Sequence, residues 1–275
     1  MKKTIGSLID LVAQSDGKIK LLDHNGESVT TYPTKMGWYL APFPMEKGIP
    51  YNADNLTTIS RAPFNSDPEF LEARKTAESR WEGNGKKRDI SWRLDIMLWA
   101  VSHAIKQWDK ESIFVECGTG RGYMAAAICQ YYRWDESKPN FFLIDTFAPN
   151  VPDQLGNQDN SNIKSFVYSD GDDDVKSYFS KYKNVEIVTG FIPDVLSQLP
   201  DSKIGFLHID LNSAVAEAGA LDTLKSKLQK GAVVLFDDYG GFGGSDQASV
   251  HEEFVRSMGS RILTLPTGQA LYFHM

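Results

Sequence analysis

Short, unbroken apolar runs recur along residues 112–238, and helical stretches separate them. In chain order the runs are SIFVEC, FFLID, VEIV, IGFLHID and AVVLFDD. A strand that is apolar on both faces must be covered on both faces, and such strands alternating with helices are typical of a parallel sheet. Residues 261–275 instead read as two strands around Thr267-Gly268, with no helix between them. The pattern therefore predicts an α/β fold whose mostly parallel sheet ends in a C-terminal antiparallel hairpin.

The chain divides into two parts with different patterns. Residues 91–107 have the spacing of an amphipathic helix, with Trp99 on its broad apolar face, and they introduce the α/β region. Residues 68–81 also read as a helix, and the polar stretch GNGKKRD that follows them reads as a linker. We therefore place a boundary near Arg88, between an accessory segment (residues 1–88) and a main domain (residues 89–275).

The accessory segment is predicted to be a lid built from small elements. A short amphipathic helix opens it, and Asn25-Gly26 is a favoured turn pair between two short strands. A stretch rich in proline and aromatic residues then runs to about Asp67, and we expect it to be irregular. A loop-rich segment of this length usually covers something.

Composition excludes several classes of protein. The chain has 36 acidic and 29 basic residues, a net charge of −7 and no long Lys/Arg run, which disfavours binding to nucleic acid. No apolar run approaches the ~18 residues that span a bilayer, and Asp10 interrupts the first apolar stretch, so we predict neither a membrane span nor a signal peptide. The two cysteines form no CxxC pair and no disulfide framework, so we expect a reduced, cytoplasmic protein.

A glycine-rich turn follows the first apolar run, in VECGTGRGY. Gly118, Gly120 and Gly122 occupy alternate positions, where glycine lets the backbone approach a ligand closely. This spacing is not the G-x-G-x-x-G that seats a pyrophosphate. The run before the turn ends near Glu116, and the next run ends in Asp145, whose carboxylate suits two ribose hydroxyls. These features favour S-adenosylmethionine as the cofactor. Thr119, Tyr123 and Gly190 complete the candidate cofactor-binding residues.

The motifs as a set resemble a known family. They are VECGTGRGY, FFLIDTF, FLHIDLN, VVLFDDYG and LPTGQAL. In this order they are similar to the core of class I S-adenosylmethionine-dependent methyltransferases, and specifically to the macrocin O-methyltransferase-like family of sugar O-methyltransferases. The resemblance covers residues 90–275. It implies a Rossmann-like seven-stranded sheet, a divalent metal near the methyl donor, and a saccharide acceptor in a glycosylated natural product or glycan precursor.

Three acids follow two of the apolar runs. Asp210 ends IGFLHID, and Asp237 and Asp238 end AVVLFDD. Ligands of an open α/β sheet bind beyond the carboxyl ends of its strands, so we expect the three carboxylates to converge there. Such oxygen ligands suit Mg²⁺, with Mn²⁺ as an alternative. The competing interpretation is that Asp237 caps a turn and Asp238 is solvated.

A metal would address the difficult step of methyl transfer to a sugar. A sugar hydroxyl is a poor nucleophile, and a bound cation lowers its pKa. The three positions also resemble the metal site of catechol O-methyltransferase, where a lysine base lies three residues beyond the first Asp, but this chain has Ser213 there. The base therefore stays open among Asp210, His208 and His251. His208 is otherwise a packed strand residue that orients the site, and His251 a solvated residue near a helix start.

Other functions compete with sugar O-methylation. An NAD-dependent sugar dehydrogenase also needs a glycine turn and a following acid, but the chain lacks the G-x-G-x-x-G turn and a YxxxK set. A catalytically inactive methyltransferase-like binding protein, and a methyltransferase acting on a non-sugar hydroxyl, remain alternatives. A homo-oligomer is expected in each case, with no nucleic acid or membrane partner.

Overall fold

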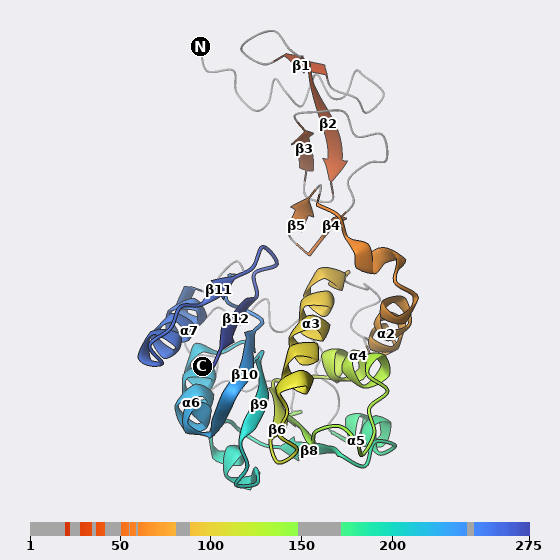
Figure 1. The fold of residues 1–275 in the computed structure, drawn as a ribbon. Coiled ribbons are helices and arrows are strands. Elements are labelled where there is room, and N and C mark those ends of the chain that lie inside the picture. Colours follow the sequence, from red (N-terminus) through yellow and green to blue (C-terminus); the bar gives the residue numbers. More distant parts are fainter. Residues whose placement is uncertain are drawn as a thin grey trace. The chain divides into compact units, whose positions relative to one another are not determined.

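The computed structural model describes nine segments of the chain, namely residues 20–22, 28–34, 37–41, 51–54, 56–58, 60–80, 89–147, 172–240 and 245–275. These residues belong to two compact units (Figure 1). One unit comprises Met1–Pro63 with Arg88–Ile90, and the other comprises Phe64–Lys87 with Ser91–Met275. The predicted N-terminal helix lies outside the described residues.

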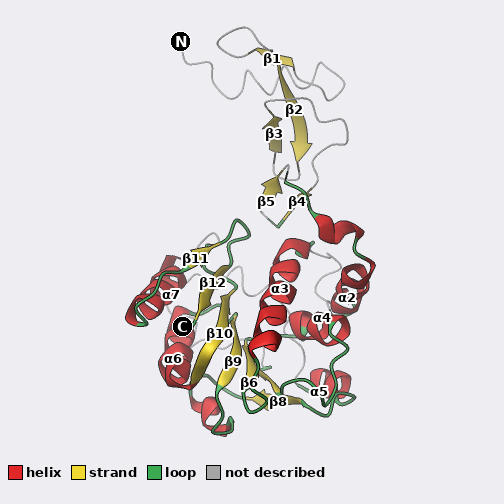
Figure 2. Cartoon of the chain, in the orientation of Figure 1, coloured by secondary structure: helices red, strands yellow, loops and turns green. Residues whose placement is uncertain are grey.

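The larger unit is built on a seven-stranded sheet, as predicted (Figure 2). Its strand order is β11-β12-β10-β9-β6-β7-β8. The strands, in chain order, are β6 (Ile113–Cys117), β7 (Phe141–Asp145), β8 (Val185–Thr189), β9 (Ile204–Ile209), β10 (Leu228–Phe236), β11 (Leu263–Thr264) and β12 (Ala270–Phe273). Pairing is parallel from β10 to β8, whereas β12 is antiparallel to both β10 and β11. The predicted C-terminal hairpin is therefore confirmed.

Helices cover both faces of this sheet. The helices of the described residues are η1 (Pro63–Ser66), α2 (Pro68–Glu78), α3 (Ser91–Gln107), α4 (Tyr123–Tyr131), α5 (Asp173–Phe179), η4 (Asp194–Gln198), α6 (Ala214–Leu224), η5 (Lys225–Lys227) and α7 (Ser245–Ser257). Val115 and Cys117 of β6 pack into a core with residues of α6 and α7. Side chains alternate along a strand, so Phe114 and Glu116 point to the opposite face, where α3 contacts β9 and β10. Every residue of β6 is buried as a result.

The helix predicted over residues 91–107 is present with those bounds, but part of its predicted apolar face is wrong. Trp99 is 47% exposed, whereas Met97, Ala100 and Ala104 are completely buried. The buried face mixes large side chains with Ala100 and Ala104, whose small size lets the helix approach the sheet closely. The large indole is left on the outer side of α3.

The smaller unit contains more strand than predicted. β1 (Lys20–Leu22), β2 (Ser28–Thr34) and β3 (Gly37–Ala41) form one antiparallel sheet, and β4 (Tyr51–Ala53) pairs with β5 (Leu56–Thr58). The pairing of β1 with β2 confirms the predicted hairpin, although its turn lies outside the described residues. The prediction of an irregular stretch is wrong over β3, β4 and β5. Pro33 is compatible with β2 because it lies beyond the residues paired with β1 and has a partner strand only in β3.

Helix α2 belongs to the larger unit, on the other side of the boundary that we placed near Arg88. The Asp67 carboxylate caps its N-terminus by accepting from the backbone N–H of Glu69 and Phe70. Phe70 is buried, and its ring lies 5.1 Å from that of Phe64, which contacts Trp92 at 5.3 Å. The helix also packs on α4. Residues 64–80 are therefore part of the fold that carries the sheet.

Candidate active site

The glycine turn between β6 and α4 has the geometry that its sequence predicts. Gly118, Gly120 and Gly122 all have positive φ angles, of 95°, 53° and 80°. A Cβ at Gly118 would lie 1.8 Å from the Asp210 carbonyl oxygen, and one at Gly122 would lie 2.5 Å from the Phe179 ring. Glycine is therefore required at position 118 by the backbone that follows β9.

Asp145 lies at the tip of β7 and holds this turn in place. Its Oδ2 accepts a 2.7 Å hydrogen bond from the Gly120 backbone N–H, and its Oδ1 accepts one of 2.9 Å from Phe147. The backbone N–H of Gly190, after β8, donates to the Asp145 carbonyl at 3.0 Å. The glycine turn, Asp145 and Gly190 therefore lie together at one edge of the sheet. Phe191, which our sequence analysis missed, is 49% exposed next to Gly190.

The other predicted cofactor residues are less accessible. Thr119 is buried in the glycine turn, and Tyr123 is buried at the start of α4. Glu116 is 2% exposed, and its Oε1 lies 2.9 Å from His208 Nδ1 on the neighbouring strand β9. Cys117 faces the helices α6 and α7. Side chains alternate along a strand, so Glu116 points to the opposite face, into the layer between the sheet and α3. The structure therefore groups Glu116 with His208 and not with the glycine turn.

The three predicted aspartates converge. Asp210 directly follows β9, and Asp237 and Asp238 directly follow β10. Each offers a carboxylate oxygen such that the three atoms lie within 4.8 Å of one another. The backbone N–H of Asp210 donates to the Cys117 carbonyl at 2.9 Å, so this acidic cluster adjoins the glycine turn.

Two residues that our sequence analysis missed hold Asp237. Arg93, in the first turn of α3, donates from Nη1 to Asp237 Oδ2 at 2.8 Å and to its carbonyl at 2.9 Å. Gln269 donates from Nε2 to Asp237 Oδ1 at 2.7 Å. Gln269 lies in the LPTGQAL motif, which was the available signal. Arg93 lies within an amphipathic helix pattern and gave none.

Burial and mutual repulsion disfavour the charged forms of the cluster. Burial, and then the charges of Asp237 and Asp238, raise the pKa of Asp210 well above its ordinary value. Burial, and then the charges of Asp237 and Glu217, raise the pKa of Asp238 to about 6. Arg93 acts in the opposite direction on both groups, but it supplies a single positive charge.

His208 is completely buried beneath the cluster, in agreement with the packed position expected for it. Its Nδ1 faces Glu116, and its Nε2 lies 4.0 Å from Asp237 Oδ1. That distance is too long for a hydrogen bond. The printed side-chain partner of His208 is therefore Glu116, and complete burial leaves His208 no direct path to a ligand in the solvent.

The position expected for His251 is wrong. We expected an exposed residue near a helix start, but α7 begins six residues earlier and His251 is completely buried. Its Nε2 lies 2.6 Å from Glu217 Oε2, and its ring stacks on Phe236 at 4.2 Å. Gln247 donates from Nε2 to Glu217 at 3.0 Å and approaches Asp238 at 3.5 Å. His251 therefore supports the acidic cluster from inside the core.

Ser213, at the position of the lysine in catechol O-methyltransferase, has a structural role. It is the N-cap of α6, and its hydroxyl accepts from the Ala216 backbone N–H at 3.3 Å. Its side chain is therefore committed to the helix. The expected departure from a catechol-type base agrees with this arrangement.

Comparison with known proteins agrees with this geometry. Residues 115–239, from the middle of β6 to just past the acidic cluster, match a family model described as a methyltransferase domain. These residues are therefore similar to a methyltransferase domain. The predictions of this enzyme class and of its resemblance to O-methyltransferases are confirmed. No curated protein is similar enough in sequence to be matched.

Solved structures of O-methyltransferases share the methyltransferase fold. The O-methyltransferase NovP is 16% identical, with a TM-score of 0.59 over 75% of this chain and 98% of that one. The calicheamicin methyltransferase CalS11 is 15% identical, with a TM-score of 0.55 over 75% and 93%. An apo structure of CalS11, described as a TDP-rhamnose 3′-O-methyltransferase, gives 14% and 0.50 over 75% and 95%. Among the described residues of this chain, no helix is long and apolar enough to cross a membrane.

Proposed function

We propose that the methyltransferase transfers the methyl group of S-adenosylmethionine to a hydroxyl of a sugar, assisted by Mg²⁺ or Mn²⁺. The observation that carries the proposal is the convergence of Asp210, Asp237 and Asp238 beside the glycine turn. A carboxylate cluster next to a nucleoside-binding edge suits the activation of a hydroxyl and not the transfer of a hydride. The similarity of residues 115–239 to a methyltransferase domain supports methyl transfer as the reaction.

Asp145 and the glycine turn are the proposed cofactor site. Asp145 Oδ1 accepts from the Phe147 backbone and, at 3.4 Å, from the Thr146 hydroxyl, whereas Oδ2 accepts from the Gly120 backbone and offers its second lone pair to a ribose hydroxyl. The bonds to Gly120 and Phe147 fix the carboxylate before a ligand arrives. Thr119, Tyr123 and Gly190 line the same turn and strand end. S-adenosylmethionine supplies the methyl group as a sulfonium, which is already a good leaving group.

The acidic cluster fits a hard divalent cation. Its donors are carboxylate oxygens, and three carboxylates with one guanidinium leave two negative charges uncompensated. We propose Asp210, Asp237 and Asp238 as the ligands. A bound cation lowers the pKa of a coordinated hydroxyl. Arg93 and Gln269 hold Asp237, so one ligand is already oriented.

Asp210 is the proposed proton acceptor. It is the cluster member that adjoins the glycine turn, so its carboxylate lies beside the proposed cofactor site. His208 is proposed as a packed residue beneath the cluster, held by Glu116, and not as the base. His251 is not proposed as the base, because its Nε2 is committed to Glu217 in the core.

A sugar acceptor is supported by the sequence motifs and by the fold shared with a protein described as a TDP-rhamnose 3′-O-methyltransferase. A non-sugar hydroxyl is the alternative, and an inactive binding protein is a second. A panel of nucleotide sugars and simple catechols, each assayed for methyl transfer from labelled S-adenosylmethionine, separates these possibilities.

The test of the proposed function measures binding and turnover separately. S-adenosylhomocysteine is titrated by calorimetry with Mg²⁺ and with EDTA, and methyl transfer to the panel is assayed under both conditions. We expect binding in both and turnover only with the metal. Turnover that persists in EDTA would reject the metal mechanism, and turnover restricted to catechols would reject the sugar acceptor. Binding without turnover on any acceptor would favour the inactive alternative.

A further inference from the structure

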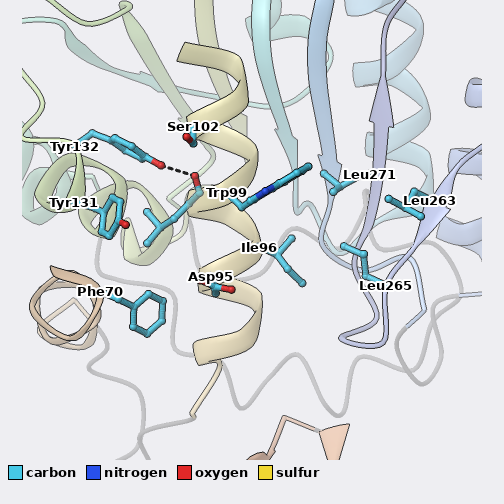
Figure 3. A pocket seen from close by; sticks show the side chains of 11 residues that line it. Phe70, Asp95, Ile96, Trp99, Ser102, Tyr131, Tyr132, Leu263, Leu265 and Leu271 are labelled. Atoms are coloured by element: carbon cyan, nitrogen blue, oxygen red, sulfur yellow. Dashed lines mark hydrogen bonds between the residues drawn. The ribbon is translucent and has the colours of Figure 1, made fainter. Parts of the chain in front are cut away.

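An apolar groove runs along the outer side of α3, away from the acidic cluster's layer. Its volume is about 450 Å³. Phe70 and Tyr131 lie on one side of the helix, and Leu263 and Leu265 lie on the other (Figure 3). Trp99 stands between the two sides. All of these residues belong to the larger unit.

Two large apolar side chains of the groove are exposed to solvent. Trp99 is 47% exposed and Leu263 is 52% exposed. The Trp99 ring is held rather than free, because it meets the His103 ring edge-on at 4.1 Å and the Phe273 ring at 6.1 Å. A fixed, exposed aromatic side chain within an apolar groove is typical of a protein interface.

One acid lies in this groove without a counter-ion. Asp95 projects from α3 beside Ile96 (Figure 3), and no described cation forms an ion pair with it. Burial, and then the charge of Asp67, raise the pKa of Asp95. Burial thus makes the charged form of Asp95 less favourable. An occupant that brings a positive or proton-donating group to Asp95 would stabilise that charged form. The groove therefore suits a partner with apolar side chains and one such group.

A second copy of the chain supplies that group at the required distance. Asp95 lies four residues before Trp99 and His103 lies four residues after it, so the three residues form one stripe along α3. If two α3 helices pack antiparallel around a two-fold axis at Trp99, Asp95 of each copy lies opposite His103 of the other. A parallel arrangement would place Asp95 against Asp95. A carboxylate opposite a ring N–H donor therefore selects the antiparallel arrangement.

We propose that the outer face of α3 is the interface of a homodimer, with Trp99 at the two-fold axis and Asp95 opposite His103 of the second copy. Such an interface is isologous, because both copies contribute the same residues. It gives the expected homo-oligomer a specific surface. It does not depend on the proposed reaction, because no residue of the acidic cluster or the glycine turn takes part.

Sedimentation velocity over micromolar concentrations tests the interface. We expect a dimer for the full-length chain and a dissociation constant at least about 30-fold higher for Trp99→Asp, as for a central aromatic anchor. The matched control is Val215→Asp on α6, because Val215 is 69% exposed but lies outside the groove. We expect it to remain dimeric. Circular dichroism confirms folding of both variants. A monomeric parent, or equal dissociation constants for the two variants, would overturn the proposal.

Charge reversal tests the antiparallel arrangement. Asp95→Lys and His103→Asp should each weaken the dimer, and the double variant should regain most of the lost affinity because a donor again faces a carboxylate, with the two positions exchanged. A parallel arrangement predicts that Asp95→Ala strengthens the dimer by removing repulsion. That result, or a double variant no tighter than the weaker single variant, would contradict the proposal. An unchanged mass in all of these variants would assign the groove to another occupant.

Discussion

The two halves of the candidate site differ in how well their polar groups are satisfied. At the cofactor edge, both Asp145 oxygens accept backbone hydrogen bonds, from Gly120 and Phe147. In the acidic cluster, burial and neighbouring acids raise the pKa values of Asp210 and Asp238. At the cofactor edge the protein itself supplies hydrogen-bond donors to the carboxylate. In the acidic cluster the carboxylates repel one another, and an added positive charge would relieve that repulsion.

This difference suggests that the cofactor edge positions the cofactor and that the acidic cluster takes part in the reaction. A carboxylate that is already bonded to its own backbone can hold a ligand with little rearrangement. A cluster of carboxylates that repel one another costs stability, and proteins keep such clusters where a function requires them. We therefore expect changes at the cofactor edge to affect binding, and changes in the acidic cluster to affect turnover.

The largest expected effect is on turnover, from Asp237→Asn. The amide keeps the shape and one acceptor oxygen but loses the charge that holds a hard cation. Because a catalytic metal supplies several kcal/mol of transition-state stabilisation, we expect turnover to fall at least ~100-fold. Steady-state kinetics with S-adenosylhomocysteine calorimetry measures both properties. The control is Asp201→Asn, because Asp201 is fully exposed outside the cluster. Equal turnover in the two variants would refute a catalytic role for Asp237.

A similar effect on stability is expected from Gly118→Ala. The added Cβ would lie 1.8 Å from the Asp210 carbonyl, and the positive φ adds strain, so we expect a loss of about 2–4 kcal/mol. Gly259→Ala is the matched control, because Gly259 also has a positive φ, of 69°, but nothing lies within 4 Å of the added atom. It should lose only about 1–2 kcal/mol. Urea unfolding measures both losses, and equal values would show that the clash is absorbed.

Asp145→Ala is expected to weaken cofactor binding. Each lost hydrogen bond to a charged group is worth about 1.5–3 kcal/mol, so the affinity for S-adenosylhomocysteine should fall about 10- to 150-fold. Part of the loss arises because Gly120 loses its partner and the turn loosens. Calorimetry measures the change, and Asp135→Ala on an exposed turn is the control. Unchanged affinity in Asp145→Ala would reject the ribose assignment.

The smallest expected effect is the pH dependence of stability without metal. The pKa of Asp238 is about 6 in the fold and lower in the unfolded chain, so the folded state binds more protons between about pH 4 and 6. The contribution of this group to stability therefore falls as pH rises through that window. Mg²⁺ should raise the melting temperature more at pH 7.5 than at pH 5, where protons compete. The same shift at both pH values would contradict binding at this cluster.

Much of the sheet could be predicted from the sequence, because buried parallel strands are recognisable as unbroken apolar runs. Asp210, Asp237 and Asp238 could be placed together for the same reason, since strand ends share one edge. The positions of Arg93 and His251 beside this cluster could not be predicted. Each residue lies within a helix, and a helical pattern shows only which face is apolar. Glu116 was assigned to the cofactor because it adjoins the glycine turn in sequence. One residue along a strand reverses the direction of the side chain, and Glu116 faces His208 instead.

The contact between Gly118 and the backbone after β9 affects how relatives of this chain should be recognised. The Asp210 carbonyl leaves no room for a side chain at position 118, whether or not a ligand binds. Descendants that have lost catalysis would therefore keep it, since any larger residue damages the fold itself. A search that scores the glycine turn alone would collect active and inactive proteins together. A search that also requires Arg93, Gln269 and the three aspartates would select the proteins that keep the acidic cluster and exclude those that keep only the glycine turn.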